Sequence, residues 1–209
     1  MSKPALKRFT DWIDVWQDRA DDFNAAVDDY PGARLAERET FLDGLAVAPG
    51  QTFLDVAAAG GYLLKGVKAR LGDDVRILAI EPSPVHAASL PDYVAVAEGS
   101  TITSFNLPDA SADRVANLSG LHHTEDIRGY FREAFRVLKP GGRMGAADVR
   151  KGSPIDAWLN TIVDQLNPEG HDGRFYEDGE FSTMLTDAGF VNVTERRAVY
   201  TWDFATVPD

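Results

Sequence analysis

The chain has 209 residues, of which 44% are hydrophobic and 26% are charged, a composition typical of one folded domain. Its 21 basic and 33 acidic residues give a net charge of −12, which argues against a nucleic-acid binder and against docking on anionic membranes. The absence of cysteine excludes disulfides, thiolate metal ligands and cysteine nucleophiles. No apolar run approaches the roughly 20 residues of a spanning helix, and the first residues lack a signal-peptide pattern, so we expect a soluble, cytoplasmic protein.

The first 49 residues are expected to be helical. Apolar side chains recur at intervals of three and four from residue 5 to 47, which predicts a helical stripe, and Pro31-Gly32 divides it into two helices. Such a stripe is more often core than pocket wall. The candidates for lining an aromatic substrate pocket are Trp12, Trp16, Phe23, Tyr30 and, from the second half of the chain, Tyr176. The stripe contains Phe9, Trp12, Ile13, Trp16, Ala20, Phe23, Val27 and Tyr30.

From residue 51 onward, short apolar runs alternate with helical segments. This pattern predicts an α/β fold with a doubly wound, mostly parallel seven-stranded sheet and helices on both faces. The last two strands are one residue apart, so we expect a hairpin or bent strand with an antiparallel edge. Strands are predicted at 52–56, 76–80, 93–97, 113–119, 143–149, 191–197 and 199–204. Helices are predicted at 61–71, 83–90, 125–138, 155–166 and 177–188.

The turn after the first strand is the first candidate binding site, because ligands of such sheets bind beyond the carboxyl ends of the strands. Asp55 to Gly61 reads Asp-Val-Ala-Ala-Ala-Gly-Gly and leads into a helix. Small residues let the backbone N–H groups approach a ligand closely, and the helix N-terminus favours negative charge. A plain tight turn for helix–sheet packing explains the same residues equally well.

An acidic residue follows the second strand. Glu81 lies 26 positions after Asp55, where an ionised carboxylate can accept hydrogen bonds from both hydroxyls of a ribose. Taken alone, an exposed acid in front of Pro82 is the simpler interpretation. Together with the small-residue turn, ribose binding is favoured.

The predicted helix after the fourth strand ends at Leu138-Lys139-Pro140-Gly141-Gly142-Arg143, because proline and glycine stop a helix. With FLDVAAAGG, ILAIEPS and LPDASADRVANLSGLHH before it, the segment REAFRVLKPGGRMGAADV resembles the class I S-adenosylmethionine-dependent methyltransferases, in the branch of ubiquinone and menaquinone biosynthesis enzymes. The resemblance covers about residues 50 to 197 and includes the closing FSTMLTDAGFVNVTERR. It implies a Rossmann-like core over residues 50–209, a helical cap over residues 1–49, S-adenosylmethionine as cofactor and S-adenosylhomocysteine as product.

The resemblance also implies which strand ends hold the cofactor. The first turn would hold the methionine end, the acid after the second strand the ribose, and the backbone after the third strand the adenine. The end of the fourth strand would lie close to the methyl group. In the same order, the residues are Asp55, Ala57, Ala59, Gly60 and Gly61; Glu81 and Pro82; Ser100 and Thr101; and Asn117 and Ser119.

The chain departs from the family pattern at two places. Ala57 and Ala59 stand where the family usually has glycine, and alanine there is costly only if the position needs a positive φ or has no room for a Cβ. Ser100 stands where an acidic residue near the adenine amine is usual.

The histidines are the candidate catalytic side chains. His122 and His123 follow the fourth strand, where imidazole is suited to act as a general base or to bind the substrate; a role in shaping the loop is the alternative. His171 and Asp172 lie in the irregular loop 167–176, which is a candidate border of the substrate pocket. Because the four histidines form no HxxxH or HxH pair, no metal site is expected.

Three functions remain open. The first is methyl transfer to a small-molecule acceptor through oxygen, nitrogen or carbon, in which the protein mainly aligns the reactants. The second is another use of S-adenosylmethionine, such as cyclisation or elimination, and the third is a non-catalytic relative; Ala57 and Ala59 alone motivate both. A nicotinamide dehydrogenase is disfavoured, because the three ordered glycines and a Tyr-x-x-x-Lys pair are missing. The acceptor and the oligomeric state are not predictable.

Overall fold

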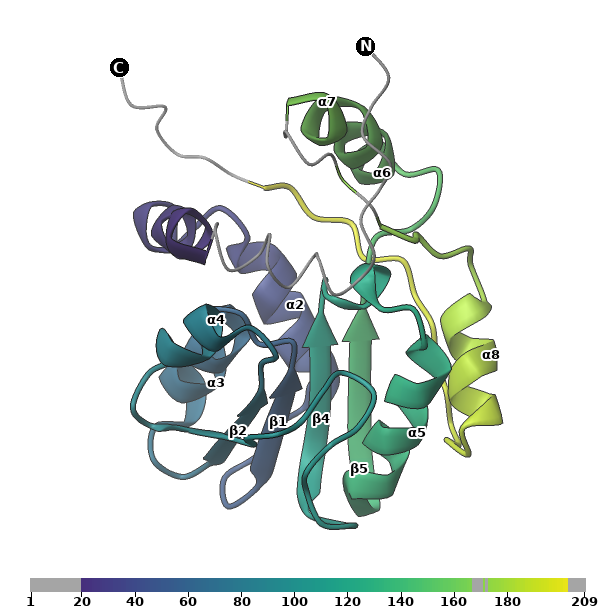
Figure 1. The fold of residues 1–209 in the computed structure, drawn as a ribbon. Coiled ribbons are helices and arrows are strands. Elements are labelled where there is room, and N and C mark those ends of the chain that lie inside the picture. Colours follow the sequence, from purple (N-terminus) through teal and green to yellow (C-terminus); the bar gives the residue numbers. More distant parts are fainter. Residues whose placement is uncertain (1–19, 167–170, 172, 203–209) are drawn as a thin grey trace.

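Five parallel strands form the central sheet (Figure 1). The computed structural model describes residues 20–166, 171 and 173–202 of the chain. The strands lie in the order β3-β2-β1-β4-β5, so the strand order reverses between β1 and β4, and the predicted Rossmann-like α/β class is confirmed. The strands are β1 (Thr52–Val56), β2 (Arg76–Ile80), β3 (Val94–Val96), β4 (Ala112–Leu118) and β5 (Leu138–Ala147).

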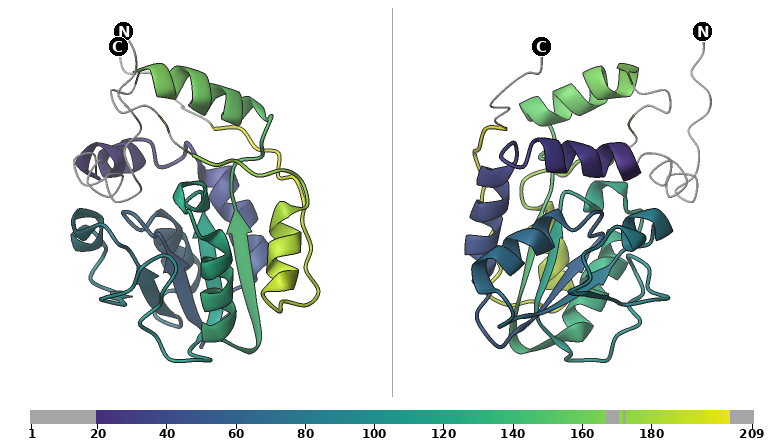
Figure 2. Two further views of the ribbon diagram at one scale, coloured as in Figure 1. Left: turned by 45° about the vertical axis from the view of Figure 1, so that its right-hand side comes forward. Right: turned by 90° about the vertical axis from the view of Figure 1, so that its left-hand side faces the viewer.

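Helices cover both faces of the sheet. In Figures 1 and 2, α5 and α8 lie on one face and α2 and α3 on the other, whereas α6, α7 and a helix at residues 20–29 lie beyond the carboxyl ends of the strands. No helix in the described ranges is long and apolar enough to cross a bilayer. The helices are α2 (Leu35–Leu45), α3 (Tyr62–Leu71), α4 (Pro84–Ala88), α5 (Ile127–Val137), α6 (Pro154–Trp158), α7 (Asp164–Leu166) and α8 (Glu180–Asp187), with a π-type turn, Leu159–Val163, joining α6 to α7.

Alternate residues of the strands supply two separate cores. Leu54 and Val56 of β1 pack toward α5 and α8, whereas Phe53 packs toward α2 and α3. Successive side chains of a strand point to opposite faces, and parallel strands are buried on both, which explains their nearly continuous apolar runs. The first core includes Leu78, Ile80, Tyr130, Phe131 and Met184, and the second includes Leu42, Leu45, Leu64, Val67 and Ile77.

The fifth strand begins earlier than predicted. Leu138 directly follows α5 and already pairs with Ala112 of β4, whereas the regular register resumes only at Arg143 opposite Arg114. Residues 139–142 therefore form a bulge inside the strand, and Gly141 supplies the positive φ of 79° that this bend requires. The helix α5 ends at Val137, one residue before the predicted end, and the Pro-Gly-Gly segment lies within β5 and does not precede it.

The sheet has five strands, and the predicted strands at 191–197 and 199–204 are absent from the described residues. Residues 191–202 have no regular secondary structure, and 203–204 lie outside the described part of the chain. Side-chain bonds hold this segment: the carboxylate of Glu195 accepts from the N–H groups of Gly179 (2.7 Å) and Ser182 (3.1 Å) at the start of α8. The predicted seven-stranded sheet with an antiparallel edge strand is therefore not confirmed.

The helix at residues 20–29 packs on the helices beside the first turn. Asn24 donates to the Ser89 hydroxyl (3.0 Å), and Asp28 pairs with Lys65 of α3 (3.0 Å). Of the predicted stripe, Ala20 is buried, while Phe23, Val27 and Tyr30 are half-buried. Phe9, Trp12, Ile13 and Trp16 lie outside the described residues, so the cap formed by residues 1–49 stays a prediction.

Candidate functional site

The carboxyl ends of β1, β2 and β4 open into a cavity of about 2620 Å³. Small-molecule sites usually have roughly 300–1,000 Å³. This cavity is larger, and its wall continues along residues 138–150 and 189–200. Of the residues predicted for the site, seven line it: Ala57, Ala59, Glu81, Pro82, Ser119, His122 and His123. The other six do not lie on its wall: Asp55, Gly60, Gly61, Ser100, Thr101 and Asn117.

The first turn carries unusual backbone geometry. Ala57 and Ala59 have φ values of 58° and 45°, in the left-handed region, and Gly61 follows with 79° at the start of α3. The first two are the positions where the resemblance leads us to expect glycine. Alanine therefore adopts a conformation at both positions that glycine reaches without steric cost.

The acid after β2 reaches back to this turn. One carboxylate oxygen of Glu81 accepts from the Ala59 N–H (2.7 Å) and the other from the Ser83 N–H (2.8 Å). Each oxygen of a carboxylate has two lone pairs, so both can still accept a hydroxyl from a ligand. Burial raises the pKa of Glu81 despite these two hydrogen bonds.

Asp55 lies beneath the turn and is only 3% exposed. Burial, and then the charge of Glu81, raise its pKa well above the usual range of an aspartate. The two predicted acids thus lie close enough to influence each other, although only Glu81 lines the cavity.

Asn117 joins the ends of β1 and β4. Its amide nitrogen donates to the Val56 carbonyl (2.7 Å), and its amide oxygen accepts from the Gly120 N–H (3.1 Å). The side chain is fully buried. Its observed contacts therefore hold the two strand ends together below the cavity.

A polar network around Ser119 was not predicted. Glu37 of α2 is 4% exposed and accepts from the hydroxyls of Ser119 (3.3 Å) and Tyr200 (3.0 Å). Arg34 binds the other oxygen of Glu37 (2.6 Å) and donates to Ser119 (3.2 Å). Burial alone would lower the pKa of Arg34, but the hydrogen bond and charge of Glu37 outweigh it and raise that pKa. One sequence feature indicated part of this network: Arg34 and Glu37 are three residues apart at the start of a helix, a spacing at which side chains can pair.

The two predicted catalytic histidines lie in a short 3-10 turn, Leu121–His123, after β4. The Nδ1 atom of His122 is 2.7 Å from Asp148, whose side chain is 1% exposed. Asp148 also accepts from the N–H groups of Leu121 and His122 (2.9 Å each) and of Val149 (2.7 Å). An aspartate carboxylate accepts hydrogen bonds, so in this arrangement His122 donates through Nδ1, and Nε2 is its second ring nitrogen. Asp148 directly follows β5, so the strand-end rule that pointed to Glu81 could have found it.

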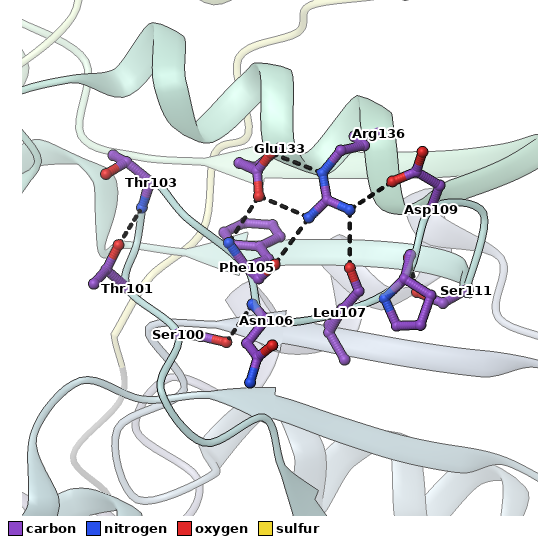
Figure 3. A network of polar contacts seen from close by, with 11 residues as sticks. Ser100, Thr101, Thr103, Phe105, Asn106, Leu107, Asp109, Ser111, Glu133 and Arg136 are labelled. Carbon is purple, nitrogen blue, oxygen red and sulfur yellow. Dashed lines mark hydrogen bonds and ion pairs between the residues drawn. The ribbon is translucent and has the colours of Figure 1, made fainter.

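The loop predicted to meet the adenine is fastened to α5 (Figure 3). Arg136 donates to the carbonyls of Phe105 (2.9 Å) and Leu107 (2.8 Å), and the carboxylate of Glu133 accepts from the Phe105 N–H (2.7 Å). The hydrogen bond from Arg136 also lowers the pKa of Glu133.

Within this loop, the Ser100 hydroxyl accepts from the Asn106 N–H (2.9 Å; Figure 3). The Thr101 N–H donates to the Ser104 carbonyl (2.8 Å). Both predicted residues thus contact their own loop, and their contact with an adenine stays a prediction.

Comparisons with known proteins agree with this geometry. A family model described as a methyltransferase domain matches residues 54–145. The uncharacterized protein YafE of Escherichia coli (strain K12) is 37% identical over 90 residues, which are 42% of this chain and 42% of YafE. A ubiquinone biosynthesis O-methyltransferase of Pseudomonas paraeruginosa is 29% identical over 187 residues, which are 83% of this chain and 77% of the relative. The chain spans about half or less of the first curated relatives that it matches.

Solved structures show the same fold. A chain from the complex between the Haloferax volcanii Trm112 methyltransferase activator and a methyltransferase superposes with a TM-score of 0.72 at 18% identity. The match covers 92% of this chain and 81% of that one.

Proposed function

Because the chain belongs to the class I S-adenosylmethionine-dependent methyltransferase family, we propose that it transfers the methyl group of S-adenosylmethionine to a small-molecule acceptor. The observation that carries this proposal is the hydrogen bond between the Ala59 N–H and Glu81 (2.7 Å), which joins the small-residue turn after β1 to the acid after β2. Both line the cavity at the open end of the sheet.

The residues present fit this cofactor. The side chains of Ala57 and Ala59 end at Cβ, which leaves the wall of the turn open to a ligand that contacts the backbone. Glu81 offers acceptor atoms for ribose hydroxyls, and the start of α3 favours a negative group such as a carboxylate. The bound cofactor supplies a sulfonium-activated methyl group. We therefore assign its methionine end to the turn and its ribose to Glu81.

Methyl transfer requires little covalent chemistry from the protein, because the methyl group of the cofactor is already activated. The acceptor's nucleophilic atom forms a bond to the methyl carbon while the carbon–sulfur bond breaks, with the electron pair staying on sulfur. The protein aligns the two reactants and excludes water, and such positioning lowers a barrier by several kcal/mol. Ser119, His122 and His123 line the cavity beyond the end of β4, so we assign the acceptor to this side. There, the histidines bind the acceptor or receive its proton.

Calorimetric titration with S-adenosylmethionine and S-adenosylhomocysteine tests the proposal. We expect micromolar binding of both, since the product keeps every contact except that of the methyl group. Glu81→Ala should weaken binding by about 5- to 150-fold, equivalent to ~1–3 kcal/mol of charge-assisted hydrogen bonding. The matched control is Glu125→Ala, which removes an exposed glutamate outside the cavity wall. Equal affinities of the two variants contradict the ribose assignment, and no binding up to millimolar concentrations contradicts the function.

A further inference from the structure

We propose that His122, His123 and His171 form a binding site for one divalent transition-metal ion of the zinc type. His122 and His123 follow β4, whereas His171 comes from the loop before α8. All three side chains line the cavity. No family motif or spacing in the sequence pointed to this site, because its third member lies about fifty positions away from the other two.

The ring nitrogens are near one another. One ring nitrogen from each histidine lies within 4.8 Å of those of the other two. The ring centroids are 4.0 Å apart for His122 and His123, 5.6 Å for His122 and His171, and 5.4 Å for His123 and His171. Zinc–nitrogen bonds of about 2.0–2.1 Å in a tetrahedron separate the ligand atoms by roughly 3.3 Å, so a closure of at most about 1.5 Å completes the site.

A buried carboxylate orients one of the three rings. Asp148 accepts from Nδ1 of His122 at 2.7 Å and is itself held by three backbone N–H groups. Metal-binding histidines almost always donate their second ring nitrogen to a carboxylate, a carbonyl or water, which fixes the tautomer and raises the basicity of the ligand nitrogen. Nε2 of His122 is therefore prepared as a ligand atom.

The loop that carries His171 is tied to the turn that carries the other two histidines. The Arg174 N–H donates to the His122 carbonyl (2.8 Å), and the Tyr176 hydroxyl donates to the Leu121 carbonyl (2.9 Å). Gly173 makes this approach possible, because a Cβ there would lie 2.9 Å from both the His122 and the His171 rings. These contacts keep His171 beside the turn, as a ligand from a distant segment requires.

The donor set selects the class of ion. Three imidazoles suit zinc and neighbouring first-row ions, whereas magnesium and calcium prefer oxygen ligands. Three protein ligands leave a fourth position open, as in catalytic zinc sites. If the proposed function holds, an oxygen atom of the acceptor takes this fourth position. The histidines then bind the acceptor through the ion and do not receive its proton themselves, and the ion would favour the ionised form of that oxygen. This last step rests on methyl transfer, but ion binding itself does not.

The test uses the whole chain, freed of metal by a chelator and then dialysed. Titration with Zn²⁺ by calorimetry should show one ion per chain, and titration with Co²⁺ should give the visible absorption of a four-coordinate site. His123→Ala and His171→Ala should each weaken Zn²⁺ binding at least tenfold. Asp148→Asn should weaken it by about 10- to 100-fold, as expected for a residue that orients a ligand. Circular dichroism verifies that each variant is folded.

His86→Gln is the matched control, because it removes the fourth histidine of the chain, which lies on α4 outside the cluster. Its Zn²⁺ affinity should equal that of the wild type. Absence of binding to the wild type, or equal affinity of the wild type and His171→Ala, overturns the site.

The same samples are titrated with S-adenosylhomocysteine, so that a failure of the metal site can be distinguished from a failure of the proposed function. Ion binding without cofactor binding leaves the metal site standing and removes the proposed function. Cofactor binding without ion binding removes the metal site alone.

Discussion

Replacing Ala57 or Ala59 with glycine should stabilise this protein. Glycine usually destabilises a folded chain, because it has more conformational freedom to lose on folding. At these two positions, however, φ is 58° and 45°, and the methyl group of alanine crowds the backbone there. Both side chains are half-buried, so their removal sacrifices little apolar contact.

The expected gain is the difference between two opposing terms. The left-handed conformation costs an L-residue about 1–2 kcal/mol, which glycine avoids. The greater freedom of glycine in the unfolded chain costs about 0.4–1 kcal/mol. The free energy of unfolding should therefore rise by ~0.5–1 kcal/mol for each substitution. For a chain of this size, 1 kcal/mol corresponds to about 2–4 °C in Tm.

Urea unfolding followed by tryptophan fluorescence measures this difference, and Ala58→Gly is the matched control. Ala58 lies between the two sites, is 5% exposed and has no positive φ. Glycine there loses a buried methyl group as well as chain entropy and should destabilise the protein by about 1–2 kcal/mol. If all three variants lose similar stability, backbone strain in this turn is refuted.

Three further substitutions test other parts of the structure. Asn117→Ala should lower the free energy of unfolding by about 2–3 kcal/mol, because it leaves the Val56 carbonyl and the Gly120 N–H without their buried partner; a loss below 1 kcal/mol in urea unfolding would contradict this. Arg136→Ala should speed limited proteolysis of the loop at residues 105–109 several-fold, whereas Arg132→Ala, whose side chain is 64% exposed, should not. Asp55→Asn should change the pH dependence of stability. Because the pKa of Asp55 is raised in the folded state, the native protein binds more protons than the unfolded chain above about pH 4, so this carboxyl destabilises the fold as pH rises. The stability of the wild type relative to Asp55→Asn should therefore fall from pH 4 upward, and a pH-independent difference in urea unfolding would exclude this.

Features that depend on neighbouring residues were predictable from the sequence. The bounds of β1 and β2 are those expected, because each apolar run is flanked by turn residues and buried on both faces. The same rules placed Glu81 at a strand end, where it indeed meets the first turn. The departure at Ala57 and Ala59 was visible too, but their positive φ required the structure.

Features that depend on distant contacts were not predictable. Glu37 meets Ser119 and Tyr200 only after the chain folds, and no spacing rule links these residues. The contact between His171 and His122 likewise forms only in the folded chain, and their spacing in the sequence does not predict it. The short apolar run at residues 191–197 predicted a strand, yet a strand also needs a partner edge, and in the described structure the side chain of Glu195 binds α8.

The contact between Glu195 and α8 makes two distant segments one cooperative unit. A helix begins with N–H groups that lack partners within the helix, and here a carboxylate from thirteen to sixteen residues further along the chain satisfies two of them, at Gly179 and Ser182. Arg197 reinforces the arrangement through its ion pair with Asp178. Opening of the segment at 191–197 therefore exposes the start of α8 to solvent. In native-state hydrogen exchange, the amide protons of Gly179 and Ser182 report on a segment that has no regular secondary structure of its own.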